Sequence, residues 1–505
     1  MFSTMIQSIV DRFHATPEAI ALVQLKGPVS FATLGQRVQA VLGLLTQQHP
    51  TFCVIYGHKE VDTVASILAC TFANVPFSVV DASNPYQRVA QVQAVHASDC
   101  LLLGDSSYQQ RCPESPTTHD LASLADQPFV LRRCVERQAN DPFYVLTTSG
   151  SSGTPKGVKI SYDSYAHFHH WYGALLEANA SQGTHVNHAC LSFDMGILDL
   201  VSSLASHQAV CMLPHTFNAM PRQNLNLLTQ CGQACATSWF STPSFLEMMC
   251  LDPKFNDQSL PELTLFFIGG EFVSPALIDT LATRFPKATL RHAYGPTETS
   301  CVTHAHPIRA IDPASLLSLG LPMGNNRITI ETPDGTPLAP GRIGEVVIYG
   351  PQVGHGYVPA SHPRNVAFGK RHGERYYRTG DMGYLDAQGH LFLKGREDGQ
   401  VKWRGNRIEL CEIETVAAHS PNVTHCAVLP VYQDKTVIDL ILFAQLLEPS
   451  PHQQRALDEH LRRHLPKYMV PSAYKFLTQM PMNLHGKIDR HQLRALRHES
   501  SAITY

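Results

Sequence analysis

The amino-acid sequence predicts an α/β protein with a large N-terminal domain and a small C-terminal one. Three observations support this: helical and strand-like segments alternate up to about Ala310, short strands with tight turns follow, and a new strand–helix pattern begins at Val401. Such alternation is typical of α/β layers with largely parallel strands. We therefore expect two layered α/β subdomains and a β-rich subdomain in residues 1–397, and a mobile α+β domain in residues 399–505.

The alternation in the first part can be followed segment by segment. Residues Val61–Asn74 have the apolar spacing of a helix, and Val75–Asp81 follow as a short buried strand. Pro275–Pro286 are predicted to form a helix with proline near its start, and Ala288–Gly295 a strand that enters a loop. Proline is favoured in the first helical turn, where its missing N–H costs nothing.

Two later regions have a different pattern of secondary structure. Turn sequences at Pro333–Glu345 and Asp386–Gly395 separate short apolar runs, which predicts antiparallel strands. Residues Gln453–Pro466 have the pattern of an amphipathic helix that ends at proline. The joint between the two domains is expected near Gly395–Gln400.

Composition excludes several classes of protein. The 505 residues carry a net charge of −3, with 44% hydrophobic and 16% charged residues, so nothing favours nucleic acid or an anionic membrane as partner. No segment approaches the roughly 20 apolar residues of a membrane span, and the N-terminus lacks the pattern of a secretion signal. The 13 cysteines form no CxxC pair, so we expect reduced thiols in a cytoplasmic protein.

Clustered histidines at His167–His170 raise the question of a metal site. No carboxylate or cysteine stands at matching ligand spacing beside them. The sequence therefore favours a helix surface or a pocket rim over a metal cluster.

A glycine-rich stretch, "TSGSSGTPKG", follows the apolar strand Phe143–Thr147. Consecutive backbone N–H groups in such a loop can bind an anion, and the hydroxyls and Lys156 add donors and charge. The GxxxxGK[ST] spacing of a Walker loop is absent. Taken alone, the loop fits a phosphate site and a flexible connection about equally well.

Three further segments carry chemistry. In "AYGPTETS", Tyr294 could stack on a base and Glu298 could hold Mg²⁺, although a turn with a solvated glutamate fits too. Asp381 lies in a glycine-flanked loop suited to ribose hydroxyls, and Arg396 offers a second cation. Lys487 follows a flexible glycine in "HGKIDR", where a plain surface lysine is the alternative.

In this order, the strings "TSGSSGTPKG", "FDMGILDL", "YGPTET", "GRIGEVVIYG", "YRTGD", "VKWRGNRIEL" and "HGKIDR" resemble the adenylate-forming superfamily. Its members include acyl-CoA synthetases, luciferases and adenylation domains of nonribosomal peptide synthetases. The resemblance covers Leu146 to Arg490 and is looser before that. Within the superfamily, "LSFDMGILDL", "STPSFLEMMCLDPKF" and "LPKYMVPSAYKF" are similar to stand-alone amino-acid–carrier protein ligases, especially D-alanine–carrier protein ligases.

The resemblance implies two reactions. ATP and a carboxylic acid give an acyl adenylate and pyrophosphate, and a phosphopantetheine thiol then takes the acyl group as a thioester. ATP and Mg²⁺ are the implied cofactors. No serine-bearing carrier module follows Arg490, so the thiol is expected on a separate carrier protein, and we expect the ligase to be a monomer.

The resemblance also implies roles for individual residues. Thr148, Glu298 and Lys487 would be catalytic, with Glu298 binding Mg²⁺ and Lys487 bridging the substrate carboxylate and the α-phosphate. Asp398 would be the hinge, and the loop around Gly405 would reach the pantetheine tunnel. ATP would contact Thr148, Ser149, Gly150, Ser151, Ser152, Gly153, Thr154, Lys156, His292, Ala293, Tyr294, Gly295, Pro296, Thr297, Asp381, Leu393, Lys394, Gly395, Arg396 and Lys487.

For the substrate, the resemblance implies that Asp194 pairs with an α-ammonium group. The other implied contacts are Met195, Leu198, Phe240, Phe267, Gly269, Ala293, Cys301, Val302 and Lys487. The positions that would line the side-chain pocket carry no charge, so a small neutral apolar amino acid is expected: D- or L-alanine, or a proline-like residue.

Three departures from the family pattern stand out. Gly269 replaces the cysteine of D-alanine ligases and is expected to leave more room beside the α-carbon. His485 stands where asparagine is commoner, and Leu393 where many relatives have tyrosine. An acyl-CoA synthetase acting on a small carboxylic acid remains the alternative enzyme, and Asp194 argues against it. A degenerate nucleotide-binding or scaffolding protein is disfavoured because the catalytic and ATP-binding positions are retained.

Overall fold

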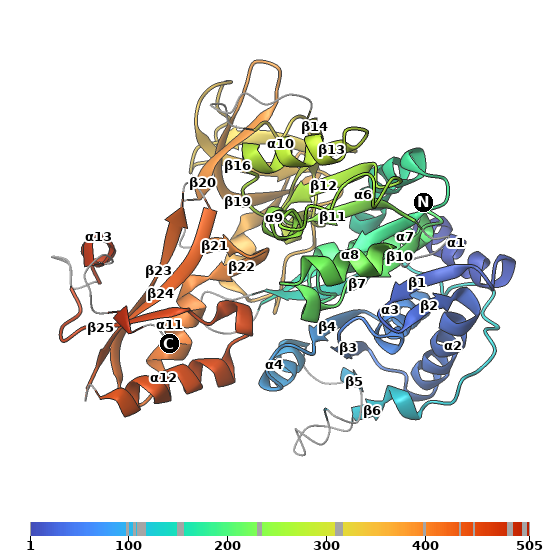
Figure 1. Ribbon diagram of the computed structural model, residues 1–505, viewed down its shortest axis with the longest axis horizontal. Coiled ribbons are helices and arrows are strands. Elements are labelled where there is room, and N and C mark those ends of the chain that lie inside the picture. Colours follow the sequence, from blue (N-terminus) through green and yellow to red (C-terminus); the bar gives the residue numbers. More distant parts are fainter. Residues whose placement is uncertain are drawn as a thin grey trace. The chain divides into compact units, whose positions relative to one another are not determined.

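The structure is a computed structural model that describes residues 2–96, 100–104, 108, 118–148, 156–229, 235–308, 317–396, 400–433, 436–447, 450–481, 488–496 and 502–503. The chain divides into two compact units. The larger contains residues 1–82, 92–147 and 157–397, and the smaller contains residues 83–91, 148–156 and 398–505. The predicted α/β class is confirmed (Figure 1).

The larger unit holds a first, mostly parallel sheet in the order β17-β8-β7-β4-β3-β5-β6. Its central strands are buried and apolar, as is usual when helices cover both faces of a parallel sheet. The strands are β3 (Phe52–Gly57), β4 (Phe77–Asp81), β5 (Cys100–Gly104), β6 (Thr118–Asp120), β7 (Pro142–Thr148), β8 (Lys156–Ser161) and β17 (Tyr357–Val358).

A second sheet follows the order β14-β13-β12-β11-β9-β10-β1-β2. It is parallel from β13 to β1, and an antiparallel strand closes each edge. The strands are β1 (Ile20–Gln24), β2 (Gly27–Ser30), β9 (Thr184–Asn187), β10 (Ala209–Met212), β11 (Ala236–Ser241), β12 (Leu265–Gly269), β13 (Thr289–Tyr294) and β14 (His304–Ile308).

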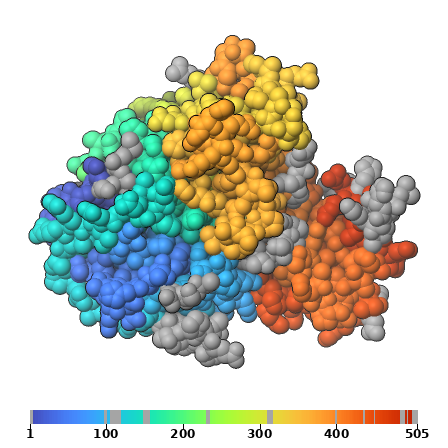
Figure 2. Space-filling view, turned by 180° about the vertical axis from the view of Figure 1, so that it is seen from behind, coloured from blue at the N-terminus to red at the C-terminus, as the bar shows by residue number. Residues whose placement is uncertain are grey.

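The predicted β-rich subdomain is a third, antiparallel sheet in the larger unit. Figure 2 shows its residues, in yellow and light orange, beside the blue and cyan surface of the N-terminal residues. Pairing of β17 with β8 joins this part of the chain to the first sheet. The strands are β15 (Arg327–Glu331), β16 (Gly344–Tyr349), β18 (Phe368–Arg371), β19 (Glu374–Leu385) and β20 (Leu391–Arg396).

Helices connect the strands of the larger unit, and their ends follow local sequence signals. Ser274 caps α10 by accepting the Leu277 N–H, and Pro275 occupies the first turn, as predicted. Asn74 ends α3 in the left-handed conformation. The helices that begin in this unit are α1 (Phe2–Ala15), α2 (Phe31–Gln48), α3 (Val61–Ala73), α6 (Tyr162–Asn179), α7 (Asp194–Ala205), α8 (Pro221–Thr229), α9 (Pro243–Met249) and α10 (Pro275–Arg284).

One apolar core joins the first two sheets. It includes Ile55 and Phe143 of the first sheet and Phe240 and Phe267 of the second. Helix α7 is buried along its whole length after Asp194, and its apolar side chains belong to this core. Because α7 begins at Asp194, the predicted ammonium partner stands at the edge of a rigid, fully packed element.

The smaller unit is α+β. Strands β23 (Val423–Gln433), β24 (Thr436–Leu446), β25 (Ala473–Phe476) and β26 (Ala502–Ile503) form one sheet, and β21 (Gln400–Trp403) pairs with β22 (Asn406–Glu409). Its helices are α4 (Gln87–His96), whose first residues group here, α11 (Leu410–Ala418), α12 (Pro451–His464) and α13 (Arg490–Ala495). The apolar side of α12 places Leu457 and Leu461 in the core of this unit.

Asp398, the predicted hinge, lies outside the described residues, so the hinge stays a prediction. None of the helices that the structure describes combines the length and apolar character needed to span a bilayer. The cysteines in the described part of the chain are free thiols.

Candidate active site

The third sheet brings Asp381 and Arg396 to the tyrosine at the end of β13. Tyr294 Oη donates to Asp381 Oδ2 at 2.6 Å, and Arg396 Nη1 donates to Asp381 Oδ1 at 2.6 Å. Burial, and then the charge of Asp381, raise the pKa of Tyr294 well above its ordinary value. The phenol therefore stays a donor, and each carboxylate oxygen keeps lone pairs that can accept ribose hydroxyls.

Glu298 lies in a short 3₁₀ turn, η3 (Thr297–Thr299), and is completely buried. Tyr357 Oη donates to Glu298 Oε1 at 2.6 Å, and Tyr377 Oη lies 3.1 Å from Tyr357 Oη. The alternative of a solvated glutamate is therefore wrong. Carboxylate oxygens are among the ligands that Mg²⁺ prefers.

Asp194 is the first residue of α7, and the Met195 N–H donates to its Oδ1 at 2.8 Å. Burial among its neighbours raises the pKa of Asp194, and hydrogen bonds from Thr297, Met195 and Cys301 oppose that rise. The nearby charge of Glu298 raises it further. A desolvated carboxylate of this kind gains stability from a cationic partner.

The predicted side-chain pocket residues belong to one large buried core. They are buried members of the core between the two parallel sheets: Met195, Leu198, Phe240, Phe267, Ala293, Cys301 and Val302. Below them, Tyr172 packs against the ring of Phe267 at 4.9 Å between centroids and donates to Asp199 at 2.7 Å. The seven predicted residues carry no charge, but Tyr172, which packs on one of them, brings a hydroxyl that is bonded to the carboxylate of Asp199.

The surroundings of Gly269 differ from the expectation that this glycine leaves extra room. It pairs with Ala293 across β12 and β13, and a Cβ added to it would lie 2.3 Å from the Ala293 carbonyl oxygen. The expected extra room is therefore wrong in this structure, because the backbone of β13 fills the space. Glycine is needed at this position for a close approach of two strands.

Other predicted ATP contacts are distributed over both units. His292 Nδ1 lies 3.1 Å from the Ser318 carbonyl oxygen, and the exposed Lys394 amine lies 5.5 Å from the Tyr384 ring centroid. Lys156, in the smaller unit, is completely buried, with Nζ 3.5 Å from Glu409 Oε1. The remaining predicted contacts are Ala293, Gly295, Pro296 and Thr297, around the end of β13, and Leu393 and Gly395 on β20.

Several predicted residues cannot be placed. Lys487, Asp398, His485 and residues 149–155, which include Ser149, Gly150, Ser151, Ser152, Gly153 and Thr154, lie outside the described residues. Thr148 ends β7, and its side chain is likewise not described. Gly405 is described: with Arg404 it forms the left-handed turn between β21 and β22, with φ values of 77° and 51°.

The clustered histidines lie on one partly exposed helix. His167–His170 lie on α6, and burial lowers the pKa of His169 to about 4. His167 faces Asp163, one helical turn earlier, with 3.7 Å between Nε2 and Oδ1. Among the described residues, these histidines do not gather into a group of metal ligands.

Sequence reasoning missed a different group: His58, Asp81 and Cys190, whose ligand atoms lie within 4.8 Å of one another. His58 Nδ1 lies 2.5 Å from Asp81 Oδ2, and His58 Nε2 accepts the His215 N–H at 3.0 Å. Because Nε2 accepts, Nδ1 carries the proton and has no lone pair for a metal. The group is a hydrogen-bond network, and two of its members follow or end β3 and β4, a signal visible in the sequence.

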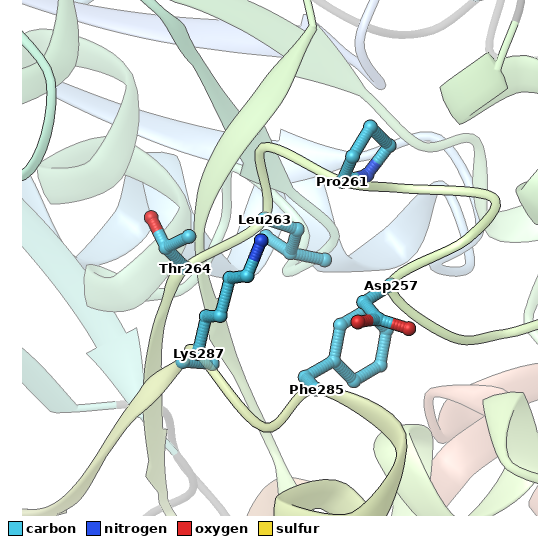
Figure 3. A pocket seen from close by; sticks show the side chains of 7 residues that line it. Asp257, Pro261, Leu263, Thr264, Phe285 and Lys287 are labelled. Atoms are coloured by element: carbon cyan, nitrogen blue, oxygen red, sulfur yellow. The ribbon is translucent and has the colours of Figure 1, made fainter.

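A small pocket lies at the opposite ends of β12 and β13. Figure 3 shows Asp257, Phe285 and Lys287 around it, next to the residues that precede the two strands. The predicted site residues Gly269 and Tyr294 are at the carboxyl ends of these strands, so this pocket is separate from the candidate active site.

Two family models match this chain: "AMP-binding enzyme" over residues 10–358 and "AMP-binding enzyme C-terminal domain" over residues 412–487. The chain therefore belongs to the AMP-binding enzyme family of the adenylate-forming superfamily, and it is an AMP-forming ligase.

Relatives within the family agree with the predicted subgroup. The D-alanine--D-alanyl carrier protein ligase of Bacillus licheniformis is 30% identical over 97% of this chain and 99% of that protein. The ligase of the same name from Bacillus anthracis is 31% identical over 95% of this chain and 96% of that protein.

Among solved structures, the Vibrio cholerae adenylation domain AlmE, in complex with glycyl-adenosine-5'-phosphate, has a TM-score of 0.83 and 20% identity, covering 97% of both chains. An o-succinylbenzoate CoA synthetase from Bacillus subtilis has a TM-score of 0.81 and 21% identity, covering 97% of this chain and 98% of that one. These similarities confirm the fold.

Proposed function

We propose that this ligase activates a small neutral amino acid, either D- or L-alanine or a proline-like residue, as its aminoacyl-AMP. It then passes the aminoacyl group to the phosphopantetheine thiol of a separate carrier protein. The observation that carries the proposal is Asp194: a partly buried carboxylate at the start of α7, whose pKa is raised by burial, beside buried apolar side chains. Such a carboxylate favours a substrate with an α-ammonium group over a plain carboxylic acid.

The relatives support the same substrate class. Two of them, at 30% and 31% identity over almost the whole chain, carry the name D-alanine--D-alanyl carrier protein ligase. AlmE was solved with glycyl-adenosine-5'-phosphate, another small aminoacyl adenylate. The buried pocket residues carry no charged side chain that would pair with a charged substrate side chain.

The nucleotide side of the site fits ATP. Asp381 would accept the ribose hydroxyls, Tyr294 would pack on adenine, and Thr148 and the following loop would hold the phosphates. Glu298 would hold Mg²⁺, which supplies positive charge to the phosphates when it is bound. Lys487 would stabilise the charge that develops between the carboxylate and the α-phosphate.

The two half-reactions would use the smaller unit in two ways. During adenylation Lys487 would reach the phosphate, and afterwards a rotation about Asp398 would bring the turn at Gly405 to the pantetheine tunnel. The left-handed turn at Arg404 and Gly405 gives that loop a fixed, narrow shape. We propose that the enzyme acts as a monomer on a carrier supplied in trans.

Amino-acid-dependent exchange of pyrophosphate into ATP tests the first reaction. A panel of D- and L-amino acids should show exchange with alanine, proline or a residue of similar size, and little with charged residues. Exchange with none of the neutral amino acids would overturn the proposal.

A second measurement tests the acceptor. Thioester should form on a phosphopantetheine-bearing carrier protein, while CoA should be a poor acceptor. Faster transfer to CoA, from a substrate without an amino group, would favour an acyl-CoA synthetase instead.

A further inference from the structure

Asp194 follows a connecting segment, residues 187–193, that runs from the end of β9 to the start of α7. The position of the carboxylate depends on how firmly this segment is held. Three contacts hold it, and one of them comes from a buried lysine that the reaction itself does not use.

Lys59 provides the first contact. It lies two residues beyond β3, is 4% exposed, and donates from Nζ to the carbonyl oxygens of Asn187 at 2.8 Å and Leu213 at 3.0 Å. Asn187 ends β9 and Leu213 follows β10, so one amine links the first sheet to two neighbouring strands of the second. Burial lowers the pKa of Lys59 to about 8, which shows how strongly the surroundings desolvate it.

The second contact joins the two ends of the segment. Asn187 Nδ2 donates to the Gly196 carbonyl oxygen, in the first turn of α7, at 2.8 Å. At Gly196 the helix approaches the segment so closely that an added Cβ would lie 2.2 Å from the Cys190 carbonyl oxygen. Movement of Asn187 would therefore be transmitted directly to the first turn that carries Asp194.

The third contact is the network of His58, Asp81 and Cys190. Asp81 takes a hydrogen bond from the Cys190 thiol and is fixed by His58. His188, also in the segment, has Nδ1 3.3 Å from the carbonyl oxygen of Phe240, a predicted pocket residue. The segment is thus tied to the first sheet through Asn187 and Cys190, and to Phe240 through His188.

We propose that Lys59, assisted by the His58–Asp81 pair, is a positioning residue that fixes residues 187–196 so that Asp194 meets the substrate ammonium. Lys59 touches neither substrate nor nucleotide in this role and acts through Asn187 and Gly196. The inference rests on the proposed function, because it assigns a task to the amino-acid site.

Lys59→Met tests the proposal, since methionine keeps most of the apolar volume and removes both hydrogen bonds. Two stable probes, alanyl-sulfamoyladenosine and propionyl-sulfamoyladenosine, differ only in the α-ammonium group. Calorimetric Kd values should show that the full-length wild-type protein prefers the alanyl probe. In Lys59→Met that preference should fall about tenfold, equivalent to ~1.4 kcal/mol.

A lysine with a purely structural role would weaken both probes equally and leave the preference unchanged, and that result would overturn the inference. Lys475→Met is the matched control: Lys475 is also buried and donates to a backbone carbonyl, that of Leu496, at 2.8 Å in the smaller unit. Its substitution should leave the preference at the wild-type value.

A second variant covers the case in which Lys59→Met does not fold. Cys190→Ala removes the thiol contact to Asp81 and should reduce the preference about threefold. An unchanged preference in Cys190→Ala would then overturn the inference. The proposed function fails in a different way, namely if the wild-type protein binds both probes equally.

Discussion

The proposed nucleotide side and the proposed amino-acid side of the site differ in how their carboxylates are held. On the nucleotide side, Tyr294, Asp381 and Arg396 are already paired with one another, and Tyr357 occupies one oxygen of Glu298. On the amino-acid side, the single carboxylate of Asp194 has its pKa raised by burial beside apolar side chains. On the first side the cation Arg396 already pairs with Asp381, whereas Asp194 is held by the neutral donors Met195, Thr297 and Cys301. We therefore expect the second side to gain from an incoming cation and to decide substrate choice.

The largest effect should come from Lys487. It would stabilise the transition state of adenylation, in which the substrate carboxylate attacks the α-phosphate. Lys487→Ala should lower the rate of pyrophosphate exchange about 10²–10³-fold, the usual cost of removing one stabilising donor. Thioester formation from supplied aminoacyl-AMP should be nearly unchanged. Equal loss of both half-reactions would contradict the two-state hinge model.

Next in size is a stability effect at Lys59, behind the amino-acid side. Its pKa is about 8 when folded against an ordinary 10.5, so between these values the unfolded state binds the proton more tightly. The free energy of unfolding should therefore gain about 3 kcal/mol from this group as pH rises from 8 to 10.5.

Denaturant titrations of the wild-type protein and Lys59→Met across this pH range isolate the contribution. The free energy of unfolding of the variant should lack this rise with pH. The contributions of other titrating groups should cancel when the values for the two proteins are subtracted. If the free energy of unfolding changed with pH in parallel for the two proteins, Lys59 would not be buried as a charged amine.

Asp194→Ala should act on the amino-acid side alone. We expect the KM for the amino acid to rise about 10- to 100-fold, because truncating one partner of a desolvated ion pair costs ~2 kcal/mol or more. The KM for ATP should change less than threefold. An unchanged amino-acid KM would refute the ammonium assignment.

The smallest effect is expected on the nucleotide side. Tyr357→Phe removes the donor to Glu298 but leaves the carboxylate buried, which should raise the Mg²⁺ concentration needed for half-maximal exchange about threefold. The KM for the amino acid should stay at its wild-type value. If the KM for the amino acid changed while the Mg²⁺ requirement did not, the division of the site into two sides would be wrong.

The sequence predicted the strand that ends near Tyr294 from its apolar pattern, and parallel strands gather their carboxyl ends on one edge of a sheet. Asp194 was assigned only through the resemblance to the family. The pairing of Tyr294 with Asp381 could not be predicted, because it joins residues 87 positions apart and depends on how the third sheet meets β13.

The error at Gly269 has a similar origin. From the sequence alone, a residue without a side chain is expected to leave extra space. The register of β12 against β13, however, puts the Ala293 carbonyl oxygen into that space. His58, Asp81 and Cys190 were missed because they lie far apart along the chain. Their meaning lies in a distance, which is a property of the folded chain.

By itself, the sequence determined the family, the α/β class and the chemistry available to the site, because ordered motifs and periodicity record local geometry and residue type. The tertiary structure decided which groups meet. It buries Glu298 against Tyr357 and places the backbone of β13 in the space beside Gly269. It also brings Lys59 to the segment that leads to Asp194. Hydrogen bonds and desolvation act over a few ångströms, and only packing brings residues from distant parts of the chain within that range.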